Sequence, residues 1–151
     1  ILSGPEPQRT LLEEKLIAEL KTFSKPILFV KGIIEKEQKM WKEDHFTFYN
    51  FMNSEQLNTA FNESEMVLCR SGYTTVMDLA KLEKKAFFIP TPGQFEQEYL
   101  AKKYTREGIA PSCKQDDFKL AMLSDVAFYN GFTNFASIIN WEKLFGVFNP
   151  K

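Results

Sequence analysis

The stretch Met66-Val67-Leu68-Cys69-Arg70-Ser71-Gly72-Tyr73-Thr74-Thr75-Val76-Met77-Asp78 decides the fold of this chain. A short apolar run predicts a buried strand, a turn of Arg, Ser and Gly follows it, and two threonines open an amphipathic helix. A helix that starts directly after a strand presents free backbone N–H groups and the positive end of its dipole. The turn therefore predicts a site for a phosphate or a diphosphate.

Apolar runs and amphipathic segments alternate on both sides of this stretch. The predicted strands are residues 1–3, 26–31, 46–50, 66–69, 86–89 and 109–111. The predicted helices are residues 10–22, 54–62, 74–82, 95–107 and 115–128, whereas the charged segment 35–44 is too polar to assign. This alternation indicates an α/β fold with a doubly wound, mostly parallel, six-stranded Rossmann-like sheet. Its expected strand order is 3-2-1-4-5-6, by analogy with that fold class.

Two connections of the predicted sheet should face each other at its switch point. In such sheets, ligands bind beyond the carboxyl ends of the strands, here after the first and the fourth. In the first connection Gly4 permits close backbone approach, and Arg9 offers a forked cation to phosphate oxygens. The second connection holds Ser71 and Gly72. The alternatives are that Arg9 is a solvated residue of the first helical turn and that Ser71 and Gly72 form an ordinary helix cap.

Composition narrows the class of protein. The 151 residues are 44% hydrophobic and carry 19 basic and 20 acidic side chains, which indicates one folded domain. A net charge of −1 argues against a nucleic-acid partner. Cys69 and Cys113 are interpreted as small core residues, and the lack of a cysteine framework favours a reducing, cytoplasmic compartment.

Metal and cofactor chemistry find little support in the sequence. No spacing of Asp, Glu, His or Cys suggests a bound cation, and no G-x-G-x-x-G follows a predicted strand. His45 is expected to be exposed rather than catalytic, and Asp116 and Asp117 are expected to cap a helix. We therefore expect neither a metal nor a cofactor.

The two ends of the chain suggest a larger context. The sequence opens on residues 1–4, which resemble the end of a buried strand, so we expect a domain excised from a larger two-domain protein. The tail, residues 131–151, is densely aromatic. It is expected to pack against a missing domain or to close this domain's own core. A less favoured alternative is that it contacts the inner face of the membrane.

Four short motifs in fixed order carry a resemblance to a known family. They are Cys69-Arg70-Ser71-Gly72, Thr75-Val76 with Asp78, Phe88-Ile89-Pro90, and Gln97-Glu98-Tyr99. Together they resemble the carboxyl-terminal, nucleotide-sugar-binding domain of GT-B glycosyltransferases. The likeness is to family 28, the branch that includes the bacterial N-acetylglucosaminyltransferase of peptidoglycan synthesis. It is strongest over residues 66–101.

This resemblance implies roles for single residues. Ser71, Gly72, Thr74 and Thr75 would contact the diphosphate of the donor. Asp78 falls where the family has an acidic residue, usually Glu, that accepts hydrogen bonds from both ribose hydroxyls. A carboxylate suits a vicinal diol because it offers two acceptors to two donors. The alternative for Asp78 is an ordinary charge on the helix surface.

The sugar and the base are less sharply predicted. Gln97 and Glu98 fall on the family's Gln-Gln pair, which hydrogen-bonds the donor sugar, although Glu98 replaces amide donors by an acceptor-only group. Phe51 or Met52 would lie against the base, with uracil favoured by family habit. The alternatives are exposed positions in a first helical turn for Gln97 and Glu98, and simple loop packing for Phe51 and Met52.

The resemblance implies the donor-binding half of a hexosyl or N-acetylhexosaminyl transferase. Acceptor site and general base would come from an amino-terminal domain, so the isolated domain should not catalyse transfer. One alternative is a hydrolase or epimerase that acts on a nucleotide sugar, with Glu98 as its acid-base group. The other alternative is a non-catalytic binding or assembly module that recruits a partner through its tail.

Overall fold

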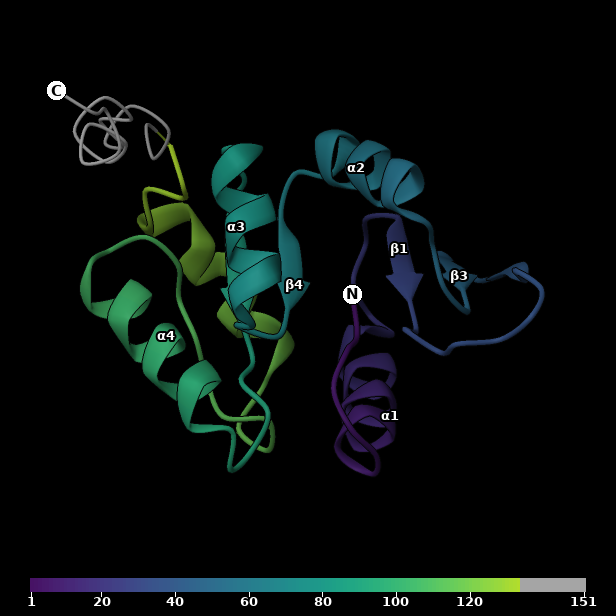
Figure 1. Ribbon diagram of the computed structural model, residues 1–151, viewed down its shortest axis with the longest axis horizontal. Helices are drawn as coiled ribbons and strands as arrows, with labels where there is room; N and C mark the ends of the chain where they lie inside the picture. The colour runs from purple at the N-terminus through teal and green to yellow at the C-terminus, as the bar shows by residue number, and fades with distance from the viewer. Residues whose placement is uncertain (134–151) are drawn as a thin grey trace, which may run out of the picture.

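A computed structural model of the protein describes residues 1–133. The elements, in chain order, are α1 (Gln8–Leu20), β1 (Ile27–Val30), β2 (Met40–Glu43), β3 (Phe46–Tyr49), α2 (Ser54–Glu63), β4 (Val67–Cys69), α3 (Tyr73–Lys81), β5 (Ala86–Phe88), α4 (Phe95–Arg106) and the 3-10 helix η1 (Leu120–Phe128). Each of the four α-helices begins and ends within two residues of its predicted bounds. Figure 1 shows β1 and β3 on one side of the molecule, and β4 with α3 and α4 on the other.

The strands form two sheets rather than the single sheet predicted. β1 pairs in parallel with β3, which pairs antiparallel with β2, while β4 and β5 form a separate parallel pair. The prediction of six strands is wrong: among the described residues, 1–3 and 109–111 form no strand. The unassigned segment 35–44 instead contributes β2, whose four residues are all exposed. A solvated edge strand carries no apolar pattern, which is why the sequence did not reveal it.

Single contacts nevertheless follow the predicted neighbour order. The Leu2 N–H donates to the Val30 carbonyl at 2.8 Å, and the Ile1 amino group donates to the Leu68 carbonyl at 2.9 Å. At the other edge, Phe88 forms a parallel bridge with Ser112. The first residues therefore lie between the two sheets without a ladder long enough to join them as one.

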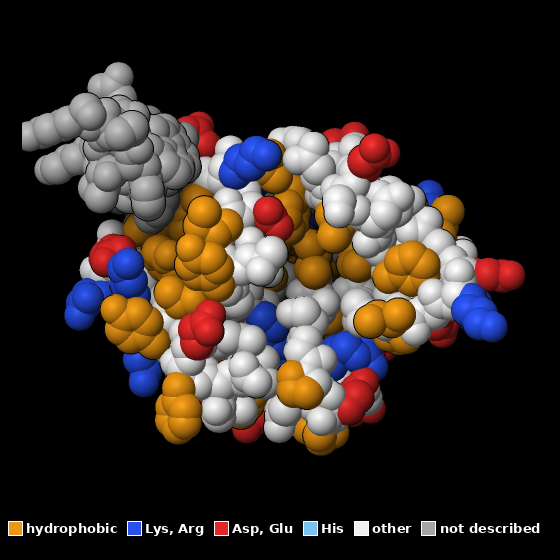
Figure 2. Space-filling view, in the orientation of Figure 1, with side chains coloured by type: hydrophobic (Ala, Val, Ile, Leu, Met, Phe, Trp, Pro, Cys, Tyr) orange, Lys and Arg blue, Asp and Glu red, His pale blue; other side chains and the backbone are white. Residues whose placement is uncertain are grey.

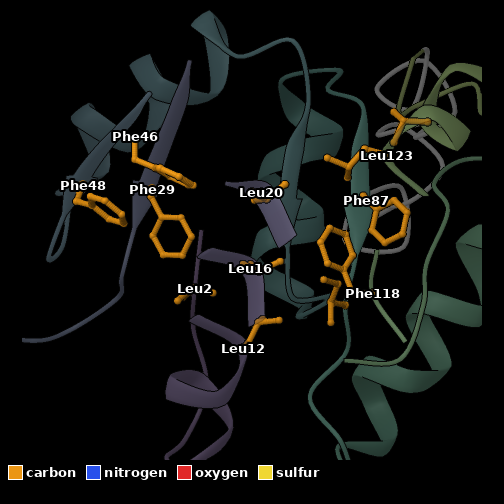
Figure 3. Packing of buried hydrophobic residues seen from close by; sticks show 12 residues of the cluster. Leu2, Leu12, Leu16, Leu20, Phe29, Phe46, Phe48, Phe87, Phe118 and Leu123 are labelled. Carbon is orange, nitrogen blue, oxygen red and sulfur yellow. The ribbon is translucent and has the colours of Figure 1, made fainter. Parts of the chain in front are cut away.

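Helix α1 packs against both sheets and so connects the two halves of the core. Its buried residues Leu12, Leu16 and Leu20 recur every four positions, which places them on one face of the helix. In Figure 3 these leucines lie between the aromatic side chains of β1 and β3 and a group that includes Phe87 and Phe118. The main core is thus continuous across the break between the sheets.

The predicted helix over residues 115–128 is wrong in its first part. A turn comes first, and the 3-10 helix η1 starts only at Leu120. Gln115 and Phe118, within and just after this turn, are both buried, at 3% and 0% exposure. Residues three apart also lie on one face of a regular helix, so the buried-exposed-exposed-buried pattern of residues 115–118 fits a helix and this turn equally well, and the sequence could not distinguish them. The two aspartates cap no helix.

Of the aromatic tail, Phe132 lies within the described residues and is fully buried. Its ring packs edge-on against Phe88 and Tyr104, with centroids 6.2 and 5.3 Å apart. At this residue the tail packs into the domain's own core. The other large apolar residues of the tail lie outside the described residues: Phe135, Ile138, Ile139, Trp141, Leu144, Phe145, Val147 and Phe148.

Both cysteines behave as core residues. Cys69 is buried and Cys113 packs, half-buried, against the main core. Burial raises the pKa of the Cys69 thiol to about 12 and that of Cys113 to about 11. Since the thiolate is the reactive form, we expect iodoacetamide at pH 8 to leave Cys69 unmodified in the native chain and to label Cys113 roughly 100-fold more slowly than a free cysteine.

Mass spectrometry of the native and the guanidinium-unfolded chain checks this prediction. Unfolding should make both thiols react at the same rate. Rapid native labelling of Cys69 would contradict its burial.

The expectation that His45 is exposed is wrong. His45 is half-buried, and its Nε2 lies 3.0 Å from the Leu20 carbonyl oxygen.

Candidate functional site

The amino terminus of α3 is open. Gly72 is its N-cap residue, no side chain caps the helix, and the first intrahelical bond runs from the Val76 N–H to the Gly72 carbonyl at 3.0 Å. The N–H groups of Tyr73, Thr74 and Thr75 therefore have no acceptor within the helix. A Cβ placed on Gly72 would meet nothing within 4 Å. These donors are accessible to an anion from outside.

The turn before α3 is fixed to α4. The Ser71 side chain is fully buried, and its hydroxyl donates to the Gln97 carbonyl at 2.7 Å. The hydroxyl proton of Ser71 is therefore already committed. The predicted contact of this turn with a diphosphate consequently falls to its main chain rather than to the Ser71 hydroxyl.

Arg70 ties the neighbouring connections together. Its guanidinium is 1% exposed and donates to main-chain carbonyls of Gln8, Ile89 and Pro90 at 2.9, 3.1 and 3.1 Å. A fourth bond runs to the Gln115 side-chain oxygen at 2.6 Å. One side chain thus links the start of α1, the end of β5 and the turn before η1.

The charge of Arg70 is held without a carboxylate. No Asp or Glu within residues 1–133 forms an ion pair with it, and its Nε has no hydrogen-bonding partner there. Burial lowers the pKa of the guanidinium to about 10, so it stays protonated at neutral pH. Carbonyl dipoles take the place of water around this cation. A buried, uncompensated positive charge also favours negative charge nearby.

The first connection lies beside these loops, as the predicted site requires. Gly4 has a φ of +102°, and a Cβ on it would lie 3.3 Å from Thr91 Oγ1. The Thr91 hydroxyl is buried and finds no partner among the described residues. The connections that follow the first, fourth and fifth predicted strands are therefore neighbours, whereas sequence alone predicted only the first two together.

Arg9 is engaged in ion pairs. Its guanidinium pairs with the carboxylates of Glu6 and Glu13 and also donates to the Lys31 carbonyl at 3.2 Å. The side chain is 13% exposed, so it is not the freely solvated residue of the alternative interpretation. Its predicted contact with a diphosphate stays a prediction, and one that requires Arg9 to leave at least one carboxylate.

Asp78 and the two threonines share one side of α3. Thr74 precedes Asp78 by four residues and Thr75 by three, which places all three on adjacent positions of the helix surface. Asp78 is exposed and forms no ion pair within the described residues. A carboxylate with both oxygens unengaged lies one turn from the open amides.

Gln97 and Glu98 already hold the loop that follows β5. The Gln97 side-chain oxygen accepts from the Thr91 N–H at 2.9 Å, and a Glu98 carboxylate oxygen accepts from the Gly93 N–H at 3.1 Å. Glu98 also lines a cavity of about 320 Å³ beside this loop. Within residues 1–133 the amide NH₂ of Gln97 and the second carboxylate oxygen of Glu98 have no hydrogen-bonding partner.

At the predicted base site, the main-chain groups of Phe51 already form hydrogen bonds within the protein. The Phe51 N–H donates to the buried Asn50 side chain at 3.0 Å, and the Phe51 carbonyl accepts from Gln38 at 2.7 Å. The main chain of Met52 has no such partner among residues 1–133. Of the two predicted residues, Met52 is the one whose N–H and C=O are unengaged.

No three His, Cys, Asp or Glu side chains gather closely enough to hold a metal ion in the part of the chain that the structure describes. None of its helices has the length and apolar character needed to cross a membrane.

The connections before α1, after β4, after β5 and before η1 meet around Arg70, and we call them the loop cluster. The sequence did not single out three of its residues, Arg70, Thr91 and Gln115. Arg70 stands inside the deciding stretch, yet a single arginine after a strand usually reaches solvent. The signal available was its position between an apolar strand and a Ser-Gly turn. Thr91 and Gln115 carried no signal, since their burial depends on segments distant in sequence.

Comparisons with known proteins agree with this architecture. The family model described as glycosyltransferase family 28 C-terminal domain matches residues 8–127. The chain is 29% identical over 96 residues to the UDP-N-acetylglucosamine--N-acetylmuramyl-(pentapeptide) pyrophosphoryl-undecaprenol N-acetylglucosamine transferase of Haemophilus influenzae strain PittGG. That match covers 62% of this chain and 27% of the relative, so the chain spans about a quarter of that protein's length.

One solved structure shows the same arrangement of elements. The crystal structure of Acinetobacter baumannii MurG matches with a TM-score of 0.59 and 19% identity, over 85% of this chain and 41% of that one. The solution structure of ALG13 matches over 74% of this chain and 56% of that one, with 15% identity and a TM-score of 0.47. The MurG likeness establishes the arrangement of elements in this chain.

Proposed function

Because this chain belongs to the family of glycosyltransferase family 28 C-terminal domains, we propose that it is the donor-binding half of a glycosyltransferase that uses a nucleotide-diphosphate sugar. The observation that carries the proposal is the uncapped start of α3 beside the Gly4 connection. A UDP-sugar is the expected donor, since the Haemophilus relative is named for UDP-N-acetylglucosamine. Hexosyl and N-acetylhexosaminyl transfer are both compatible with this.

The diphosphate would be held by main-chain donors. The N–H groups of Tyr73, Thr74 and Thr75 point out of the helix start, and the helix dipole adds positive potential there. The buried Arg70 guanidinium adds further positive potential from beneath the turn. Donors already in place when the sugar–phosphate bond breaks stabilise the charge that develops on the leaving diphosphate.

The nucleoside and sugar would be held on either side of the diphosphate. Asp78 accepts from both ribose hydroxyls, and the unengaged main chain of Met52 pairs with the edge of the base. The free amide of Gln97 donates to a sugar hydroxyl, while the second oxygen of Glu98 accepts from one. An acceptor-only group at position 98 pairs with a hydroxyl of the sugar, which hexosyl and N-acetylhexosaminyl donors both offer.

The rest of the reaction is assigned to another domain. Transfer requires a base to deprotonate the acceptor hydroxyl. Among the described residues near the proposed donor, Asp78 and Asp116 form no ion pair and Glu98 has one oxygen unengaged; Asp78 and Glu98 are assigned to the ribose and the sugar, and none of the three is assigned as the base. We propose that acceptor site and base lie in an amino-terminal domain or partner subunit in the cytoplasm, at the inner face of the membrane, and that residues 1–151 bind donor without transferring it.

Calorimetric titration tests the donor proposal. UDP and UDP-sugars should bind, and Asp78→Ala should weaken UDP binding about 10- to 100-fold, because two charge-assisted hydrogen bonds are lost. The matched control is Asp125→Ala, which removes an exposed carboxylate from η1 and should leave the affinity unchanged. The same titrations with 2′,3′-dideoxyuridine diphosphate should show no difference between wild type and Asp78→Ala.

The outcomes separate the classes of function. If no nucleotide binds, the donor-binding proposal is wrong and the alternative of a non-catalytic binding or assembly module is favoured. Release of free sugar from a UDP-sugar by residues 1–151, lost in Glu98→Gln, would instead support the hydrolase. Equal weakening of UDP and its dideoxy analogue by Asp78→Ala would place Asp78 away from the ribose.

A further inference from the structure

Strand β2 forms a free edge of the three-stranded sheet. The order of that sheet is β1-β3-β2, so β3 pairs with one side of β2 and, within residues 1–133, no strand pairs with the other. All four residues of β2 are exposed, and Met40 and Trp41 keep 55% and 38% of their surface in solvent. Figure 2, in the orientation of Figure 1, shows hydrophobic, basic and acidic side chains together at the end of the molecule where β3 lies. A free strand edge is a template for pairing with another chain.

The backbone groups at this edge belong to Met40 and Lys42. The Asn50 N–H donates to the Lys39 carbonyl, and the antiparallel register continues from there to the pair of Glu43 and Phe46. Residues 39, 41 and 43 therefore exchange hydrogen bonds with β3, whereas Met40 and Lys42 direct their N–H and C=O groups away from it. None of these four groups has a hydrogen-bonding partner among the described residues. The edge thus offers two donors and two acceptors to an added strand.

A row of aromatic rings on one face of the sheet ends at this edge. Phe29, Phe48 and Trp41 are cross-strand neighbours in β1, β3 and β2, and the centroids of successive rings lie 5.3 and 5.2 Å apart. Phe29 and Phe48 are buried, whereas Trp41 is partly exposed. In the described part of the chain, no aromatic ring lies on the outer side of Trp41. A strand added at the edge could continue the row.

The charges that flank Trp41 have opposite signs. Side chains alternate between the two faces of a strand, so Lys39 and Glu43 share the face of Trp41, one before it and one after it. Glu43 forms no ion pair within residues 1–133. Lys39 Nζ lies 3.0 Å from a Glu35 carboxylate oxygen, but these side chains are 64% and 37% exposed, and such a pair is weak. The segment Lys39 to Glu43 is therefore complementary to itself in antiparallel orientation.

We propose that β2 pairs antiparallel with β2 of a second copy of this chain, about a two-fold axis beside Trp41. Met40 exchanges both backbone hydrogen bonds with the partner's Lys42, and Trp41 lies opposite the partner's Trp41. Lys39 then lies opposite the partner's Glu43, and the symmetry forms this ion pair twice. The two three-stranded sheets become one sheet of six strands. The proposal is independent of the donor site and of the proposed function.

The two neighbouring registers are less favourable. Backbone pairing requires outward-facing residues to meet, so the register can shift only by two residues at a time. One shift places Lys42 opposite the partner's Lys42, and like charges directly opposite each other are destabilising. The other places Lys39 opposite the partner's Trp41 and forms no ion pair at that position. An edge contact this short should give a weak dimer, with a dissociation constant on the order of 10–100 μM.

Paired charge reversals test the register. In Lys39→Glu two contacts between carboxylates replace the two ion pairs, and in Glu43→Lys two contacts between ammonium groups do so. Each variant alone should dimerise about 10- to 100-fold more weakly than the wild type in sedimentation equilibrium. An equimolar mixture of the two variants should recover the wild-type affinity, because position 39 of each chain then faces the opposite charge at position 43 of the other.

Matched controls carry the same charge changes away from β2. Glu14→Lys and Lys21→Glu alter exposed residues in and just after α1 that form no ion pair within residues 1–133. Both should dimerise as the wild type does, alone and mixed. Lys42→Pro removes an outward N–H without touching the bonds to β3, so it should abolish the dimer while the circular dichroism spectrum stays unchanged.

Amide exchange in the wild-type chain locates the interface without any substitution. Raising the protein concentration from about 5 to about 500 μM should slow exchange at the Met40 and Lys42 amides about 3- to 10-fold. The Trp41 and Glu43 amides, already bonded to β3, should change less. The proposal is overturned by a chain that stays monomeric, by a mixture that dimerises no more tightly than either variant alone, or by a dimer in which Met40 and Lys42 gain no protection.

Discussion

Replacing Arg70 by methionine is expected to lower the free energy of unfolding by about 3–5 kcal/mol. Methionine fills much of the same volume but donates no hydrogen bond. The substitution leaves the carbonyls of Gln8, Ile89 and Pro90 and the Gln115 side-chain oxygen without the donor they share. Buried acceptors that lose their partner pay the cost of desolvation without compensation.

Urea unfolding followed by circular dichroism measures this loss. Arg106→Met is the matched control, because Arg106 is exposed in the last turn of α4 and has no hydrogen bond within residues 1–133; its change should stay within about 0.5 kcal/mol. Arg70→Lys should fall between them, since an ammonium cannot reach all the acceptors of a forked guanidinium. An Arg70→Met chain as stable as Arg106→Met would show that the bonds around Arg70 add nothing to stability.

Gly32→Ala is the second change with a large expected effect, also about 3–5 kcal/mol. Gly32 has a φ of +67°, and an added Cβ would lie 2.4 Å from the Leu2 carbonyl oxygen. That oxygen belongs to the segment that spans the two sheets, so it cannot move away without breaking the bond from Leu2 to Val30. Both the strain of alanine at positive φ and the clash of its Cβ with the Leu2 backbone therefore lower the free energy of unfolding.

Gly93→Ala separates the two contributions. Gly93 also has a positive φ, +78°, but an added Cβ there would meet nothing within 4 Å. Its cost should be the backbone strain alone, about 1–2 kcal/mol. Unfolding curves of both variants in the same denaturant give the difference, which is the contribution of the clash. Equal losses would mean that the Leu2 segment yields freely and is not held between the sheets.

The helices and the core strands could be predicted because their signals are local. Leu12, Leu16 and Leu20 repeat at helical spacing, and the apolar runs of β1, β3, β4 and β5 stand clear of their polar flanks. The segment around Met40 could not be predicted, because all four residues of β2 are exposed and their pairing depends on β3. The helix predicted over residues 115–128 was wrong in its first part for the same reason: it too depends on a distant contact. Gln115 is buried because its side chain accepts a hydrogen bond from Arg70.

The candidate site divides in the same way. The Ser71-Gly72 turn and the helix behind it follow from a few adjacent residues, so sequence placed the open amides of α3 correctly. The hydrogen-bonding partners of the site residues could not be predicted from the sequence. Ser71 and Gln97 hold each other, Arg9 is paired with two carboxylates, and the Phe51 main chain is occupied.

The sequence by itself determined the class of fold, the bounds of the α-helices and the family, because hydrophobic period, turn residues and short motifs are properties of neighbouring positions. Only the tertiary structure decided which polar groups are free for a ligand and which are spent inside the protein. It also decided that the Arg70 cation is solvated by carbonyls. Hydrogen bonds between segments far apart in the chain have directions and lengths that only the folded coordinates specify.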